Sequence, residues 1–326
     1  MLEVYDKIVA ECQTLNQLGQ RHLSIELTLT PAEMVELQRQ LVPNRYWDLH
    51  CSNTHLEREA MRAASTAWLS RLRVLHDCSG KSRPEPFLRE ELLRSVTRYS
   101  DGKGRAGKWL VITFCGAAYR AMMSSATYLQ LFDAATTDVV MVRDYYRKGF
   151  RRGVTELSNS IEETFARLPV MLDASSYAGV SIVGTSGGAV ASLQYAMATG
   201  AHAAVAAGPS PPYDPARRLR DGRLPAQVLQ SLAERRPLPR MALLYGRESL
   251  DRPAAEAVAA IVPVTLFEIT APDQKVGHNA LWPLLLQGRL GDFLAEHLDL
   301  PPSKGEREPA LVPTRAEASS FQEPLA

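Results

Sequence analysis

Short apolar runs alternate with segments of helical periodicity over the last two thirds of the chain. Runs of strand type, almost continuously apolar, occur at 108–114, 138–144, 179–184, 202–208, 240–246 and 264–270. Such runs are typical of strands buried on both faces of a parallel sheet. Helical segments are expected between them, at about 154–172, 187–199, 225–236 and 253–262, with a last one near 281–298. This alternation predicts a three-layer α/β/α sandwich with a mostly parallel sheet.

The first hundred residues follow a different pattern, which predicts a mainly helical region. Apolar and polar residues alternate over 24–30, and this alternation predicts a half-buried strand. Thr30, with Glu33 three positions later, forms the capping-box signature of a helix start. A long helix is expected from Thr54, and a short one over 87–96.

These patterns divide the chain into three parts. We expect a mainly helical N-terminal region over 1–104 and an α/β domain over 105–300. The tail over 301–326 is rich in proline and charge and lacks apolar periodicity, so it is expected to be disordered.

Composition excludes several classes of protein. The chain has 326 residues and a formal net charge of +1, whereas a general nucleic-acid binder carries a basic excess. No apolar stretch approaches the roughly 18 residues that span a membrane, and charges throughout the first twenty residues argue against a secretory signal. Four cysteines do not suggest a disulfide framework. Together these absences predict a cytoplasmic protein.

The stretch "VSIVGTSGGAV" at 180–190 contains the first candidate for chemistry. Its residues Gly184 to Gly188 match G-x-S-x-G, with Ser186 at the centre. In such a strand-to-helix turn the small neighbours avoid clashes, and the helix start offers free N–H groups beside the serine. The alternative is an ordinary glycine turn. The buried strand before the motif and the helical segment after it favour a nucleophile.

A serine nucleophile needs a base, and the base needs an orienting carboxylate. Of seven histidines, His278 alone lies in a loop just past an expected strand, in "APDQKVGHNAL". The acid should follow the strand at 240–246, where Asp251 and Glu248 are candidates, each with the alternative of a surface charge. We favour Asp251, because a short side chain at a helix start is easily fixed. Glu248 remains a rival, and Asp273 a weaker one.

The order Ser186, Asp251, His278, the turn and the strand alternation resemble the α/β-hydrolase superfamily over about 105–300. This resemblance implies a sandwich of α/β-hydrolase type and a serine hydrolase that cleaves an ester, thioester or related acyl bond through an acyl-enzyme on Ser186. It implies no cofactor. Two alternatives stay open: an acyltransferase that uses the same triad, and a non-catalytic binding protein with this fold.

The resemblance also implies an oxyanion hole. Its donors would be the N–H of Gly187 and that of Gly116 or Ala117 in "FCGAAYR". The sequence departs from the family at two points: Cys115 precedes Gly116 where the family has His-Gly, and Ser249 occupies the common position of the acid.

The segment "RDYYRKGFRRG" at 143–153 is rich in basic residues and follows an expected strand. One interpretation is a solvated loop without a function in binding. The alternative hypothesis is that Arg147 and Arg151, with Arg120, bind an anionic part of a small-molecule acyl substrate, such as a phosphate or an acidic sugar. Cys115 is expected to be a buried structural thiol. No Cys/His cluster has the spacing of a metal site, so no metal is expected.

Overall fold

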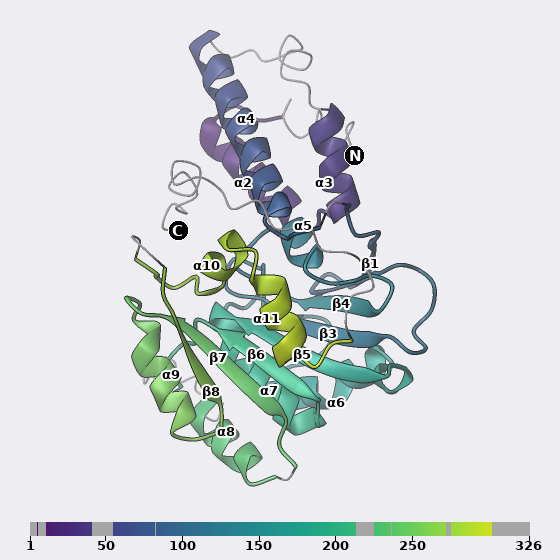
Figure 1. Cartoon of the computed structure of the whole chain (residues 1–326), viewed down its shortest axis with the longest axis vertical. Helices are drawn as coiled ribbons and strands as arrows, with labels where there is room; N and C mark the ends of the chain where they lie inside the picture. Colours follow the sequence, from purple (N-terminus) through teal and green to yellow (C-terminus); the bar gives the residue numbers. More distant parts are fainter. Residues whose placement is uncertain are drawn as a thin grey trace.

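An eight-stranded sheet forms the centre of the computed structural model (Figure 1), in the order β1-β2-β4-β3-β5-β6-β7-β8. The structure describes residues 5, 11–40, 55–81, 83–212, 225–235, 237–271 and 275–301, with no side-chain description for 40 and 55–58. The strands are β1 (Leu88–Leu93), β2 (Val96–Ser100), β3 (Trp109–Phe114), β4 (Thr137–Val142), β5 (Gly179–Thr185), β6 (Ala203–Ala207), β7 (Arg240–Gly246) and β8 (Thr265–Ile269). The tail over 302–326, Thr54 and Asp273 lie outside the described residues.

The sheet is mostly parallel. Strand β3 pairs in parallel with β4 and β5, and the parallel ladder continues from β5 through β6 and β7 to β8. The hairpin of β1 and β2 adds to β4 in the antiparallel sense. The six parallel strands are the six predicted apolar runs, and they confirm the expected fold class.

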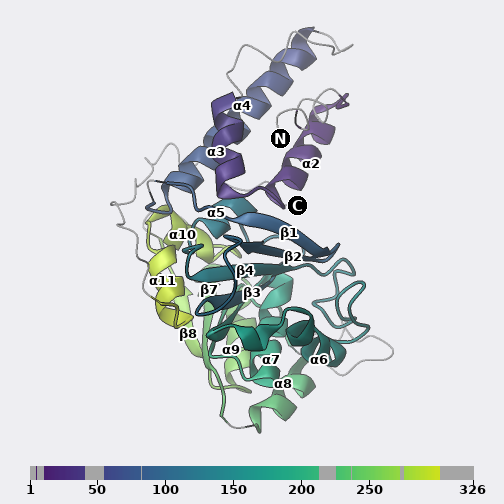
Figure 2. The same ribbon diagram turned by 90° about the vertical axis from the view of Figure 1, so that its right-hand side faces the viewer.

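Helices cover both faces of the sheet, as Figure 2 shows. One face carries α6 (Ile161–Met171), α7 (Ala189–Thr199), α8 (Pro225–Ala233) and α9 (Asp251–Ala259); the other carries α5 (Ser125–Leu129), α10 (Leu281–Leu286) and α11 (Leu290–His297). Neighbouring residues of a strand pack on opposite faces of the sheet. Ile112 belongs to the hydrophobic cluster that contains Leu193 of α7, and Val111 belongs to the cluster that contains Leu284 of α10. This period of two buries both faces of the sheet.

The helix expected over 87–96 is wrong, because this segment forms β1 and the start of β2. Its residues "LREELL" have high helix propensity, but β1 is an edge strand whose first four residues are exposed. An edge strand buries little, so its composition carries no strand signal. The sheet therefore begins at Leu88, before the expected start of the α/β domain.

The strand expected over 24–30 is also wrong. Helix α2 (Leu15–Glu26) includes its first three residues, and its buried positions Leu18, His22 and Glu26 recur every four residues. That spacing belongs to a helix face, which outweighs the short alternation. The helix expected near 281–298 is two helices, which Gly288, at φ +67°, separates.

The N-terminal helices gather at one end of the molecule, beyond β1 and α5 (Figure 1). Helices α3 (Pro31–Gln40) and α4 (His55–Asp77) both contact α5. The predicted capping box is present: the Glu33 N–H donates to Thr30 Oγ1 at 3.2 Å, and the Thr30 N–H donates to Glu33 Oε2 at 2.9 Å. Although α4 has 23 residues, neither it nor any other described helix is apolar enough to span a membrane.

Candidate active site

Ser186 follows β5 in a tight turn that leads into α7. Its φ of +51° is in the left-handed region, which is uncommon and strained for a residue other than glycine. A Cβ at Gly184 would collide with the Ser192 side chain, and one at Gly188 would collide with the Phe114 carbonyl. The turn therefore needs glycine at both positions, which is the physical basis of the motif in the sequence.

His278 contacts Ser186 from the loop between β8 and α10. Its Nε2 lies 2.8 Å from Ser186 Oγ, and its Nδ1 lies 2.8 Å and 3.0 Å from the two carboxylate oxygens of Asp251. In the tautomer that carries its hydrogen on Nδ1, His278 donates to the Asp251 carboxylate, and Nε2 presents its lone pair to the serine hydroxyl. This is the arrangement in which a histidine can take the proton of a serine.

Of the two candidate acids, the structure places Asp251 beside the histidine. Asp251 is the first residue of α9, is 8% exposed, and donates its backbone N–H to Ser249 Oγ at 3.2 Å. The Glu248 carboxylate instead accepts the N–H of Val276 at 2.8 Å, and the Glu248 N–H donates to the Val276 carbonyl at 3.3 Å. Glu248 thus fixes the segment that precedes His278.

The histidine loop packs against the chain that follows β3. Asn279 Nδ2 donates to the carbonyl of Met122 at 2.9 Å. Gly208, at φ +61° after β6, leaves room for both segments, because a Cβ there would lie 2.7 Å from Met122 Cε and 2.9 Å from the His278 carbonyl oxygen. The loops after three strands therefore fix one another around the imidazole.

The three residues follow three different parallel strands, in the same order along the chain as expected from the sequence. The serine follows β5 at the head of a helix, the acid follows β7, and the histidine follows β8. In this architecture the nucleophile stands on a strand-to-helix turn, and its partners follow in the order acid, histidine. The chain has the α/β-hydrolase fold.

No protein-family model and no curated protein matches the chain. Among solved structures it is similar to the acylaminoacyl peptidase of Pyrococcus horikoshii, at 11% identity and a TM-score of 0.45 over 68% of this chain, and it spans 43% of that protein. It is also similar to brefeldin A esterase, a bacterial homologue of human hormone-sensitive lipase. The sequence identity is 16% and the TM-score 0.42, over 70% of this chain and 86% of that one. An esterase of Pyrobaculum calidifontis is similar at 13% sequence identity and a TM-score of 0.43, over 83% of this chain and 98% of that one.

The two backbone groups expected as alternative oxyanion donors differ in their surroundings. The N–H of Gly116 donates to the carbonyl of Arg120 at 3.0 Å, so it is already engaged. Ala117 N is the nearest atom, at 3.9 Å, to a Cβ built on Gly187. Gly187 lies in the first turn after Ser186, where backbone N–H groups have no acceptor within the helix. The geometry thus favours Ala117 over Gly116 as the partner of Gly187.

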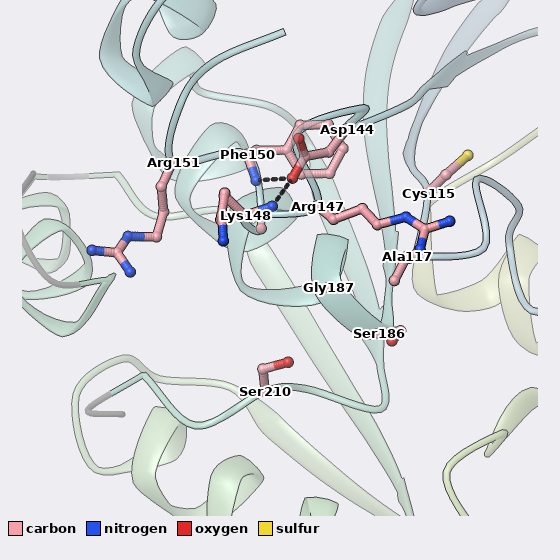
Figure 3. Close-up of a pocket in the computed structure, with 12 residues that line it drawn as sticks. Cys115, Ala117, Asp144, Arg147, Lys148, Phe150, Arg151, Ser186, Gly187 and Ser210 are labelled. Carbon is pink, nitrogen blue, oxygen red and sulfur yellow. Dashed lines mark hydrogen bonds between the residues drawn. The ribbon is translucent and has the colours of Figure 1, made fainter. Parts of the chain in front are cut away.

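A pocket of about 260 Å³ opens beside Ser186 (Figure 3). Its lining residues are Cys115, Gly116, Ala117, Asp144, Arg147, Lys148, Gly149, Phe150, Arg151, Ser186, Gly187 and Ser210. The expected residues Arg147 and Arg151 are among them. Lys148 was not singled out from the sequence, although it lies in the same basic segment.

Arg120 does not line this pocket, so the structure does not bring it together with Arg147 and Arg151. Its Nη1 lies 2.8 Å from Glu26 Oε2 in α2. The Glu26 side chain is 3% exposed. Its carboxylate also accepts hydrogen bonds from Arg71 Nη2 at 2.6 Å and from Trp68 Nε1 at 2.8 Å. Arg120 therefore ties the loop after β3 to the N-terminal helices.

Cys115 lines the pocket, but its thiol is buried. Burial raises the pKa of this thiol to about 11, so it is protonated at neutral pH and is a poor nucleophile. Within the described part of the chain, no group of three His, Cys, Asp or Glu side chains is placed to hold a metal ion.

Proposed function

We propose that the protein is a serine hydrolase that cleaves an ester, thioester or related acyl bond. The observation that carries this proposal is the continuous hydrogen-bonded relay from Ser186 through His278 to Asp251, with a closest approach of 2.8 Å at each step. The strained serine stands at the border of a pocket, where an acyl group can reach it.

In the first half of the reaction, Ser186 Oγ attacks the acyl carbonyl while His278 Nε2 takes the hydroxyl proton. The N–H groups of Gly187 and Ala117 stabilise the negative charge on the carbonyl oxygen; removal of one such donor typically costs about 10²–10³ in rate. The C–O or C–S bond then breaks, and the leaving alcohol or thiol receives the proton from His278. Asp251 stabilises the imidazolium throughout.

In the second half, His278 takes a proton from water, and the resulting hydroxide attacks the acyl-enzyme. The carboxylic acid leaves, and Ser186 regains its proton. The His278 side chain is 52% exposed, so water has direct access to the base.

A fluorophosphonate probe tests the proposal, because it bonds to activated serines. The wild-type protein should be labelled and Ser186→Ala should not. Ser210→Ala is the matched control, since Ser210 lines the same pocket and its removal should leave labelling intact. Circular dichroism checks that both variants fold. A folded wild-type protein that is not labelled would overturn the proposal in favour of a non-catalytic binding protein.

A further inference from the structure

The pocket beside Ser186 is strongly basic on one side. Arg147, Lys148 and Arg151 all come from the loop after β4. Among its lining residues, Asp144 is the one carboxylate. Within the described residues, neither Arg147 nor Lys148 forms an ion pair, so their charges remain available to a ligand.

The Asp144 carboxylate is committed to the backbone of the same loop. Its Oδ1 accepts the N–H of Tyr146 at 2.9 Å, and its Oδ2 accepts those of Lys148 at 2.7 Å and Phe150 at 2.9 Å. Figure 3 shows the latter two bonds as dashed lines from Asp144. A buried carboxylate with three N–H donors stabilises one conformation of the loop. Asp144 thus organises the basic residues.

The loop also lies close to the serine turn. Gly149 has φ +61°, and a Cβ there would lie 3.2 Å from the Gly187 carbonyl oxygen. The neighbouring residues Arg147 and Phe150 also have positive φ values, 52° and 62°. The loop therefore places its basic side chains beside the turn that carries Ser186.

Arg147 is held in place before any ligand binds. Its guanidinium lies over the ring of Tyr119, 5.1 Å from the centroid, and its Nε donates to Tyr119 Oη at 3.0 Å. Tyr119 is two residues from Ala117, and Figure 3 shows the Arg147 side chain extending toward Ala117. With Nε engaged, the two terminal nitrogens offer the planar pair of donors that matches a carboxylate or a phosphate.

We infer that this pocket selects acyl substrates that carry an anionic group, a carboxylate or a phosphate, close to the scissile bond. This inference rests on the proposed function, because it takes Ser186 as the nucleophile. Arg147 and Lys148 bind the anionic group, and Arg151 adds positive potential. A volume of about 260 Å³ is below the usual range of about 300–1,000 Å³ for ligand pockets, so the group that it holds is small.

Matched ester pairs test the inference on each side of the scissile bond. On the acyl side, p-nitrophenyl butyrate is compared with p-nitrophenyl hemisuccinate, which has the same chain length and one carboxylate. On the leaving-group side, phenyl acetate is compared with 4-acetoxybenzoate. The wild-type protein should prefer the anionic ester of at least one pair by about tenfold to a hundredfold in kcat/KM, the range expected for a charged hydrogen bond. Added salt should reduce this preference.

Variants then assign the preference to the loop. Arg147→Gln and Lys148→Gln should each remove most of it, mainly through KM, because a contact with a group that does not react binds substrate and transition state alike. Arg152→Gln removes the same charge from an adjacent residue outside the pocket and should leave the preference unchanged. Inorganic phosphate and propionate, as competitive inhibitors, distinguish which anion the pocket binds better.

Failure of this inference is distinguishable from failure of the proposed function. If the wild-type protein hydrolyses the neutral esters and reacts with the fluorophosphonate, but shows no preference in either pair, the anionic substrate is wrong and the hydrolase stands. A preference that survives in both Arg147→Gln and Lys148→Gln also overturns it. If no ester is hydrolysed and no label is incorporated, the proposed function itself fails.

Discussion

Two buried carboxylates, Asp251 and Glu26, bond to side chains of the loops around Ser186, and their partners differ. Asp251, 8% exposed, bonds to His278, which takes up a proton in the proposed reaction. Glu26, 2% exposed, bonds to the permanent cations Arg120 and Arg71. The charge of Glu26 is therefore compensated in the folded state. In the proposed reaction, the charge of Asp251 gains a counterion when His278 takes the proton of Ser186.

This difference predicts that one carboxylate governs rate and the other governs stability. A charge whose partner appears during the reaction stabilises the transition state selectively. Removal of a carboxylate that is paired in the folded state destabilises the fold, because its arginine partners then lose their counterion. Three measurements test this contrast.

The largest effect is expected from Asp251→Asn, which should lower kcat for p-nitrophenyl butyrate by about 10⁴-fold, because an amide favours the wrong tautomer of the histidine. Its midpoint of urea unfolding should stay near that of the wild type. Glu248→Gln is the matched control, since its amide oxygen can still accept the Val276 N–H, and it should retain a rate close to wild type. Equal losses in the two variants would contradict the assignment of the acid.

The second effect is on stability. Glu26→Gln should lower the free energy of unfolding by about 3 kcal/mol, at the lower end for a broken buried ion pair, because the Arg71 side chain is 32% exposed. Urea denaturation measures this loss, and kcat of the folded fraction should fall far less than in Asp251→Asn. Glu36→Gln, which removes the partner of exposed Arg39, should leave the unfolding midpoint unchanged. Glu26→Gln would contradict the contrast if it proved as stable as that control.

The smallest effect concerns the two histidines near these carboxylates. His278 is half-exposed, whereas His22 is buried, stacked on Trp68 with ring centroids 4.0 Å apart, and its Nε2 lies 3.2 Å from Tyr5 Oη. Burial, aided by the charge of Arg71, lowers the pKa of His22 to about 4. The unfolded chain, with an ordinary pKa of 6.5, then binds a proton that the folded chain excludes, so stability falls as pH falls from 6.5 toward 4.

When the pH falls from 7.5 to 5, the burial of neutral His22 should lower the free energy of unfolding by about 2 kcal/mol. Urea unfolding at the two pH values measures the loss, and the loss should be smaller in His22→Gln, which does not titrate. Other groups contribute equally to both proteins, so the difference isolates His22. The same pH dependence in both proteins would show that the N-terminal helices admit the protonated imidazole.

The parts of the fold that local pattern governs could be predicted from the sequence. The six parallel strands are buried on both faces, so each reads as a continuous apolar run. The glycines around Ser186 are required by collisions within the turn itself, and His278 follows an expected strand by a short distance. Both positions therefore fall at one edge of the sheet by topology alone.

Long-range pairing could not be predicted. Arg120 was grouped with the other basic residues because of its position after a strand, but its partner Glu26 lies 94 residues away, and nothing local to either residue signals the pair. The sequence favoured Asp251 over Glu248 because of its place at a helix start, but both follow β7 closely, and the contact with the imidazole could not be derived from that position. Only the loop conformation directs one carboxylate to the imidazole and the other to the Val276 N–H.

The antiparallel hairpin of β1 and β2 has a consequence for solubility. Strand β2 covers the outer edge of β4, and β1 ends the sheet with exposed charged residues at Arg89, Glu90 and Glu91. Charges on an edge strand discourage pairing with another chain. A chain shortened to begin at residue 105 would lose both strands and expose the apolar β4 as a new edge. The hairpin thus covers an apolar strand edge that would otherwise favour aggregation.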